Sequence, residues 1–218
     1  LKTPLTAVAG YLETLRLKGA SLSEDQRIEF LDIAINRAED LKVLVEKILD
    51  LSRLDSAADD LPCQRVDLEN LLRESALDLK PAAAANAVRI NINNKAPSPV
   101  FVMAEGSLLR RALSNLIDNA IRYNRSGGKV AIDMNSSDGL ARVSISDTGT
   151  GIPAEDLPRV CERFYRVSKD RARSTGGSGL GLSIAKSVLK AHGSELLIRS
   201  TYGQGTTVEF VLPLAETR

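Results

Sequence analysis

The chain has 218 residues, enough for one or two domains with a sizeable core. Its 29 basic and 28 acidic residues almost cancel, so no overall charge favours binding to nucleic acid or to a membrane surface. Aromatic residues make up only 4% of the chain and tryptophan is absent, which argues against aromatic stacking on single-stranded nucleic acid.

Apolar runs and cysteine usage point to a cytoplasmic segment. The longest apolar runs are too short to span a bilayer, and no signal peptide is recognisable. Cys63 and Cys161 lie far apart without a CxxC pattern, so we expect two reduced thiols rather than a disulfide or a metal site. Because the sequence opens at Leu1 within a helical pattern, we expect a fragment, with any membrane segment upstream of it.

The first 56 residues predict two helices joined by a short turn. The apolar residues of the first helix, 1–18, recur at three- and four-residue steps, at Leu5, Val8, Leu12 and Leu15. After the break at 19–23, a second helix is predicted over 24–56, with Ser23 and Gln26 as a capping box at its start.

The apolar stripe of the second helix is wider than two antiparallel helices can bury between themselves. A coiled-coil seam is formed by Leu31, Ala34, Ala38, Leu41, Val45 and Ile48. Further apolar positions widen it, at Ile28, Ile35, Leu44, Leu51 and Leu54. A homodimer that forms a four-helix bundle would bury this face. The alternative is one hairpin packed on the rest of its own chain.

The remainder of the chain predicts a linker and then a mixed domain. Residues 57–66 break the periodicity with two aspartates and Pro62. Asp67 then caps a helix over 68–86, which Pro81 kinks or weakens. Further helices are predicted over 105–123, 153–163 and 180–191, and strands over 88–93, 100–103, 129–134, 140–146, 195–200 and 206–212. The fold class is therefore α+β, a helical hairpin followed by an α/β sandwich.

Three polar residues follow the core-facing stripe of helix 105–123. Asn115, Asn119 and Arg122 lie at its edge, at i, i+4 and i+7. Amide oxygens can ligate Mg²⁺ and arginine pairs with phosphate, so these residues suit a metal-bridged polyphosphate. The alternative is that they cap neighbouring loops or face solvent.

Two glycine-rich stretches suggest contacts with a nucleotide. Asp147 ends a strand and is followed by Gly149 and Gly151, which place a carboxylate beside exposed backbone. With Ala154 they fit a dinucleotide fingerprint, but no second strand ending in an acidic residue follows about 20 residues on. The second stretch, 176–181, runs into a helix whose free N–H groups could bind an anion, or it is a flexible hinge. Neither a Walker A sequence nor the protein-kinase signatures occur.

The order of the motifs carries a family resemblance. NLIDNAIRY (115–123), DTGTGIP (147–153), ERFYR (162–166), GGSGLGLSIAK (176–186) and YGQGTTVEF (202–210) resemble the N, G1, F, G2 and G3 boxes of sensor histidine kinases. LKTPLTAVAGYLETL at the start resembles the end of their dimerisation and phosphoacceptor motif. The resemblance implies a dimeric helical hairpin over 1–56, a linker over 57–66 and an ATP-binding domain of the GHKL (Bergerat) type over 67–218.

The resemblance also implies a role for each matching residue. Asp147 would accept a hydrogen bond from the adenine amino group, inside a loop shaped by Gly149 and Gly151. Asn119 and Asn115 would ligate Mg²⁺. The remaining ATP contacts implied are Arg122 on phosphate, Tyr123 near the nucleotide, Phe164 at one lid end, Gly177, Gly179, Leu180 and Gly181 in the phosphate cradle, and Thr206 on the adenine side. Lys169, Arg171 and Arg173 of the lid either contact phosphate or are solvated.

The acceptor half of the implied reaction lies outside the sequence. The family's phosphorylated histidine would stand two residues before Leu1, and the single histidine, His192, matches the end of the helix after the lid. From that upstream histidine the phosphoryl group would pass to an aspartate of a response regulator. Thr3 matches a position that orients water for dephosphorylating the regulator, or it is simply a first-turn helix residue. The alternatives are a GHKL ATPase or protein serine kinase, and a non-catalytic pseudokinase scaffold.

Overall fold

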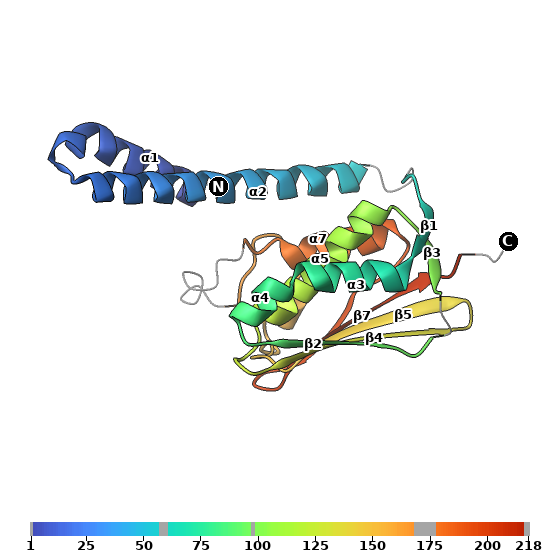
Figure 1. The fold of residues 1–218 in the computed structure, drawn as a ribbon. Coiled ribbons are helices and arrows are strands. Elements are labelled where there is room, and N and C mark those ends of the chain that lie inside the picture. Colours follow the sequence, from blue (N-terminus) through green and yellow to red (C-terminus); the bar gives the residue numbers. More distant parts are fainter. Residues whose placement is uncertain (1, 57–60, 97–98, 168–177, 216–218) are drawn as a thin grey trace. The chain divides into compact units, whose positions relative to one another are not determined.

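The computed structural model describes residues 2–56, 61–96, 99–167 and 178–215. It divides into two compact units, Leu1–Arg53 and Leu54–Arg218 (Figure 1). The first unit is a helical hairpin of α1 (Lys2–Lys18), a 3₁₀ turn (Gly19–Ser21) and α2 (Glu24–Ser56).

The predicted capping box fixes the start of α2. The Ser23 backbone N–H donates to Gln26 Oε1 at 3.1 Å, and the Gln26 N–H donates to Ser23 Oγ at 3.2 Å. Two of the N–H groups that every helix start leaves without an intrahelical partner are thereby satisfied. The helices also meet through Tyr11 and Phe30, whose ring centroids lie 5.6 Å apart.

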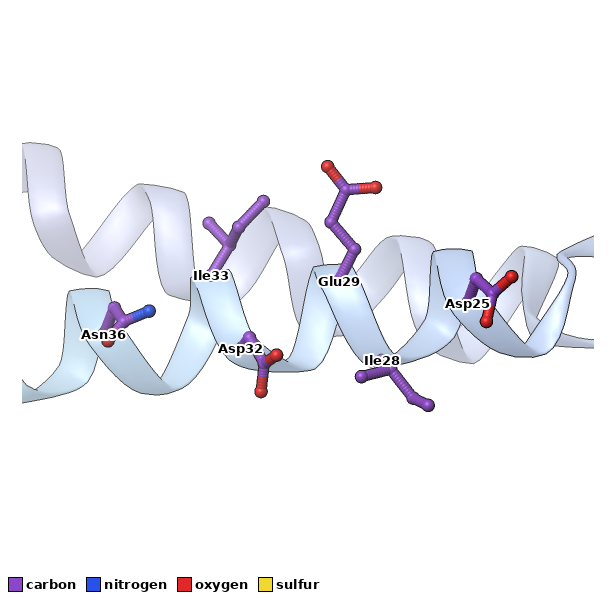
Figure 2. A pocket seen from close by; sticks show the side chains of 6 residues that line it. All are labelled: Asp25, Ile28, Glu29, Asp32, Ile33 and Asn36. Atoms are coloured by element: carbon purple, nitrogen blue, oxygen red, sulfur yellow. The ribbon is translucent and has the colours of Figure 1, made fainter.

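The hairpin leaves much of its apolar surface in solvent. Among its described side chains only Ala34 is buried. Seven large apolar residues are exposed instead: Leu5, Leu12, Leu17, Ile28, Leu31, Ile35 and Val45. A shallow depression on α2 (Figure 2) mixes this apolar surface with acid and is lined by Asp25, Ile28, Glu29, Asp32, Ile33 and Asn36. One hairpin therefore does not bury the stripe that its own sequence carries.

The second unit is a two-layer α/β sandwich, as the sequence predicts. Its strands are β2 (Arg89–Asn94), β4 (Lys129–Ser137), β5 (Leu140–Asp147), β6 (Leu197–Thr201) and β7 (Gly205–Pro213), in the sheet order β2-β4-β5-β7-β6. Only the β2–β4 pair is parallel. The helices α3 (Leu68–Asp78), α4 (Lys80–Ala85), α5 (Gly106–Arg122) and α7 (Gly181–Ala191) lie on one face of the sheet (Figure 1).

The core lies between the sheet and this helical layer. Ile132, Ile145 and Val208 stand opposite one another on β4, β5 and β7, and all are buried. Because side chains alternate along a strand, the neighbouring residues of these strands, such as Asp133 and Ser144, lie on the other face and are partly exposed. The helices contribute buried residues of their apolar stripes, among them Leu68, Leu72, Leu109, Leu113, Leu116, Ile117 and Val188.

One strand of a two-stranded sheet occupies the end of the predicted linker. β1 (Gln64–Asp67) pairs antiparallel with β3 (Phe101–Ala104), so assigning 64–66 to a linker was wrong. The strand is too short for its alternation to be visible, and its partner comes more than thirty residues later in the chain. The Arg65 guanidinium lies 3.8 Å from the centre of the Phe101 ring, a cation–π contact across this pair.

Two helix predictions change at prolines. The helix over 68–86, capped by Asp67 as expected, breaks at Leu79 into α3 and α4, with Pro81 in the first turn of α4. The prediction of a helix over 153–163 was wrong, because this segment contains turns and only a short 3₁₀ stretch, Leu157–Arg159. Pro158 accounts for the second change, since a proline inside an α-helix removes one hydrogen bond and clashes with the preceding turn.

The single histidine joins the end of α7 to the start of α5. The backbone N–H of Glu105, the residue that caps α5, donates to His192 Nε2 at 3.0 Å. His192 Nδ1 lies 2.8 Å from the Val188 carbonyl oxygen. Because Nε2 accepts from this N–H, Nδ1 carries a ring proton and donates to the Val188 carbonyl. His192 is therefore a structural residue of the second unit.

Replacing this histidine should destabilise the second unit. We expect His192→Ala to lower the free energy of unfolding by about 1–2 kcal/mol, because it leaves a partly buried N–H group without an acceptor. Urea denaturation followed by circular dichroism measures the change. Lys190→Ala, at an exposed position of the same helix turn, is the control and should change stability by less than about 0.5 kcal/mol. Equal losses in both variants would contradict this role.

Candidate functional site

The carboxylate of Asp147 is held at the end of β5, a central strand of the sheet. Its Oδ1 accepts from the Gly149 N–H at 2.7 Å and from the Thr206 N–H at 3.3 Å. Burial raises the pKa of Asp147, although both N–H groups act in the opposite direction. Among the described residues, all hydrogen bonds to this carboxylate end on Oδ1. Its Oδ2 is thus the oxygen left to accept from a ligand.

Three glycines let backbone segments pack closely at and around the Asp147 loop. A Cβ at Gly205 would lie 2.0 Å from the Asp147 carbonyl oxygen, and Gly205 has φ +127°. A Cβ at Gly151, with φ +64°, would lie 2.1 Å from the Thr201 carbonyl oxygen, and one at Gly149 would lie 2.3 Å from that of Tyr123. No side chain fits at these distances, so only glycine lets these segments surround the carboxylate.

Ser200 ties the same segments together from β6. Its Oγ accepts from the Ile152 N–H at 2.8 Å and donates to the Gly205 carbonyl at 2.9 Å. It also lies 2.9 Å from Thr206 Oγ1, which places the predicted Thr206 beside the Asp147 loop. Sequence reasoning missed Ser200, because one serine in a strand carries no signal of its partners.

Asn115 and Asn119 face the start of α7. A Cβ at Gly181 would lie 3.2 Å from Asn115 Oδ1, and 3.4 and 3.6 Å from Nδ2 and Oδ1 of Asn119. The Asn115 Nδ2 donates to the Arg111 carbonyl at 2.9 Å, which directs its Oδ1 toward Gly181. The N and G2 motifs, about sixty residues apart in the sequence, thus meet in one place.

The N-terminus of α7 lacks a side-chain cap. Leu180 occupies the cap position without a side-chain hydrogen bond, and its own side chain is fully buried in the core. The first N–H groups of a helix have no intrahelical partners, so this end can bind an anion. Two half-buried amides and an uncapped helix start therefore lie next to each other.

Phe164 and Gly179 join the two ends of the segment before α7. The Phe164 N–H donates to the Gly179 carbonyl at 2.9 Å. Phe164 has φ +66°, an uncommon conformation for a bulky residue, and its side chain is 53% exposed. Of the other predicted contacts in this region, Gly177, Lys169, Arg171 and Arg173 lie outside the described residues.

The structure also places three further predicted residues, Arg122, Tyr123 and Thr3. Arg122 pairs with Asp118 at 3.0 Å on α5. Tyr123 caps the end of α5, and its carbonyl accepts from the Thr150 N–H at 3.0 Å, so its backbone holds the Asp147 loop. Thr3 belongs to α1, in the other unit. The phosphate contact of Arg122 and the role of Thr3 stay predictions.

Two family models match the chain one after the other. The His Kinase A (phospho-acceptor) domain matches residues 1–57, and the Histidine kinase-, DNA gyrase B-, and HSP90-like ATPase family matches residues 104–216. The chain belongs to the sensor histidine kinases. Over 99% of its length it is 36% identical to the sensor histidine kinase WalK of Bacillus subtilis, covering 35% of that protein. Over 98% it is 39% identical to the sensor-like histidine kinase SenX3 of Mycobacterium bovis, covering 51% of that protein.

A solved structure matches across both units. Full-length ShkA in complex with AMPPNP is 30% identical, with a TM-score of 0.76, and the match covers 99% of this chain and 44% of that one. The chain spans about a third to a half of the curated relatives it matches. Within the part of the chain that the structure describes, no helix is long and apolar enough to cross a membrane.

Replacing Asp147 by asparagine should not destabilise this histidine kinase domain. The raised pKa means that folding favours the protonated carboxyl, so the associated stability is present below the unfolded pKa of about 4 and is lost as pH rises through the folded value. An amide stays neutral and keeps an acceptor for Gly149 and Thr206. We expect Asp147→Asn to melt at or above the wild-type temperature at pH 7, with a smaller difference near pH 4. A clearly lower melting temperature at pH 7 would contradict this.

The close approach of the Gly205 backbone to the Asp147 carbonyl predicts that alanine costs more stability at Gly205 than at Gly203. Gly203 and Gly205 both have positive φ, but a Cβ at Gly203 meets no atom within 4 Å. We expect Gly203→Ala to cost about 1 kcal/mol through backbone strain alone. Gly205→Ala adds a collision with the Asp147 carbonyl and should cost at least about 2 kcal/mol more. Urea denaturation compares the two, and equal costs would show that the backbone can move aside.

Proposed function

We propose that this chain binds ATP with Mg²⁺ and forms the kinase core of a two-component sensor histidine kinase. The observation that carries the proposal is the grouping of three separate motifs in one domain. Among the described residues, no hydrogen bond ends on Oδ2 of Asp147, which lies near Thr206, and Asn115 and Asn119 converge on the start of α7, which has no side-chain cap. One end of this arrangement suits a base edge, and the other suits phosphates with a cation.

Asp147 recognises adenine in this proposal. Its Oδ1 is held by two backbone N–H groups, so Oδ2 accepts from the amino group of the base. Gly149 and Gly151 shape the loop around the base by packing closely on the backbone of Tyr123 and Thr201, and Thr206 stands on the same side. A partly buried carboxylate prefers a ligand that donates a hydrogen bond, because it has lost part of its hydration.

The amides and the helix start hold the phosphates. Asn119 and Asn115 supply oxygens for Mg²⁺, and the first N–H groups of α7, with Gly179, Leu180 and Gly181, face phosphate. Among the described residues no three His, Cys, Asp or Glu side chains cluster to hold a metal, so a cation here needs amide and phosphate oxygens. Mg²⁺, when bound, neutralises phosphate charge. Arg122 adds a cation beside Asn119.

The reaction moves one phosphoryl group twice. The bond between the γ-phosphorus and the bridging oxygen of ATP breaks, ADP leaves, and a phosphorus–nitrogen bond forms on a histidine just upstream of Leu1. An aspartate of a response regulator then takes the phosphoryl group from the histidine. The protein contributes positioning and charge neutralisation, the main terms in phosphoryl transfer. Thr3, near that histidine in sequence, orients water for dephosphorylating the regulator.

A homodimer through the hairpin completes the proposed assembly. Its support is the exposed apolar surface of α1 and α2, on which only Ala34 is buried among the described side chains. A second hairpin would cover Leu31 and Ile35, as in a four-helix bundle. The core works in the cytoplasm, where ATP and a response regulator are available, and any membrane segment belongs to other parts of a longer protein.

Phosphorylation of a longer chain that includes the upstream residues tests the function. With Mg²⁺ and γ-labelled ATP, we expect a base-stable, acid-labile phosphate on the wild-type chain. Asp147→Asn and Asn119→Ala should each lower it at least a hundredfold, while Asn91→Ala, at an exposed position of β2, should leave it unchanged.

The other outcomes identify the alternatives. An acid-stable adduct would indicate a protein serine kinase, and free phosphate without any adduct would indicate an ATPase. Calorimetry with ATP and Mg²⁺ separates both from a pseudokinase scaffold, which would bind no nucleotide.

A further inference from the structure

Arg125 connects two loops that surround Asp147. It lies in the turn between α5 and β4, and its side chain donates to three backbone carbonyls. Its Nε donates to Thr148 at 2.6 Å, and its guanidinium Nη2 donates to Gly149 at 3.1 Å and to Gly203 at 2.8 Å. Thr148 and Gly149 follow β5, whereas Gly203 lies in the turn between β6 and β7.

The carbonyl of Thr148 belongs to the peptide that holds the Asp147 carboxylate. Its other end is the Gly149 N–H, which donates to Asp147 Oδ1 at 2.7 Å. Arg125 therefore donates to one end of a peptide whose other end donates to Asp147. Hydrogen bonds in such a chain polarise and strengthen one another. A positive charge at the carbonyl end makes this N–H a better donor and fixes the peptide plane.

The turn at Gly203 is held to the same loop by a second contact. The Gly203 N–H donates to the Thr150 carbonyl at 2.7 Å, while its own carbonyl accepts from Arg125. Two residues beyond this contact, the Gly205 backbone passes close to Asp147, and Thr206 donates to Oδ1. Arg125 thus supports both of the N–H groups that orient the carboxylate.

The chemistry of this contact requires arginine. A guanidinium presents several N–H donors in one plane, which matches three carbonyls on two loops, whereas an ammonium is a single point of charge. Among the described residues no acidic side chain pairs with Arg125, so its hydrogen bonds go to these loops.

We propose that Arg125 is a positioning residue for base recognition. It holds the Thr148–Gly149 peptide and the Gly203 turn so that Asp147 Oδ1 stays bound to the protein and Oδ2 faces the amino group of adenine. This inference rests on the proposed ATP site. In this proposal Arg125 acts through Asp147 and not on the nucleotide itself, so its effect depends on the 6-amino group of the base.

Nucleotide affinity measured by calorimetry tests the proposal. The ligands are ATP and purine riboside triphosphate, which lacks the 6-amino group, each with Mg²⁺. We expect Arg125→Ala to weaken ATP binding about tenfold, the loss typical of a hydrogen bond to a charged group, and to weaken the purine ligand less than about twofold. Arg125→Lys should lose most of the same ATP affinity. Arg142→Ala, at an exposed position of β5, is the matched control and should change neither.

The outcomes separate this inference from the proposed function. Unchanged ATP affinity in Arg125→Ala, with binding abolished in Asp147→Asn, would overturn the role of Arg125 and leave the ATP site intact. Equal losses for ATP and the purine ligand would also overturn it, because a general structural role does not depend on the amino group. If the wild-type chain binds no ATP, the proposed function fails before the variants are compared.

Discussion

Two backbone N–H groups donate hydrogen bonds to the Asp147 carboxylate, and the arrangement of the loops in the second unit depends on this contact. The Gly149 and Thr206 N–H groups come from different loops and meet on one oxygen. To bring them there, Gly205 must pass so close to the Asp147 backbone that a Cβ would lie 2.0 Å from its carbonyl oxygen. Burial of the carboxylate raises its pKa, so the charged form costs the folded domain stability at neutral pH, while Oδ2 can accept from a ligand.

A similar argument applies to the opposite end of the site, where Asn115 and Asn119 meet the start of α7. Asn115 and Asn119 stand at the edge of a stripe whose other members are buried, and α7 begins without a side-chain cap. Both features place polar groups where they can take further hydrogen bonds. A phosphate chain with a cation would satisfy them together, because it offers anionic oxygens to N–H groups and brings a metal for amide oxygens.

The hairpin follows a different principle, because local contacts stabilise it and only Ala34 is buried among its described side chains. The capping box of Ser23 and Gln26 fixes where α2 begins, and the ring contact of Tyr11 and Phe30 joins the helices. Large residues such as Ile28 and Ile35 nevertheless remain about half exposed. Burial of such side chains is worth about 1.5–3 kcal/mol each, so a second hairpin would gain much by covering them.

The sequence alone determined the fold class and the family of this protein, because the patterns that indicate both lie in neighbouring residues. The caps at Ser23 and Asp67, the alternation of β4 and β5, and the order of five motifs follow from neighbouring residues, and they yielded the fold class and the family. Very short elements, and contacts between residues far apart in the chain, could not be predicted from the sequence. The pairing of β1 with β3 carries no pattern in four residues, and Pro158 lies inside the segment 153–163 that was predicted to be a helix. Ser200 and Arg125 act on backbone groups far along the chain, which no side-chain pattern records. Only the tertiary structure could bring Asn115 to Gly181 and Arg125 to Gly203, because such contacts depend on how the sheet and the helices pack.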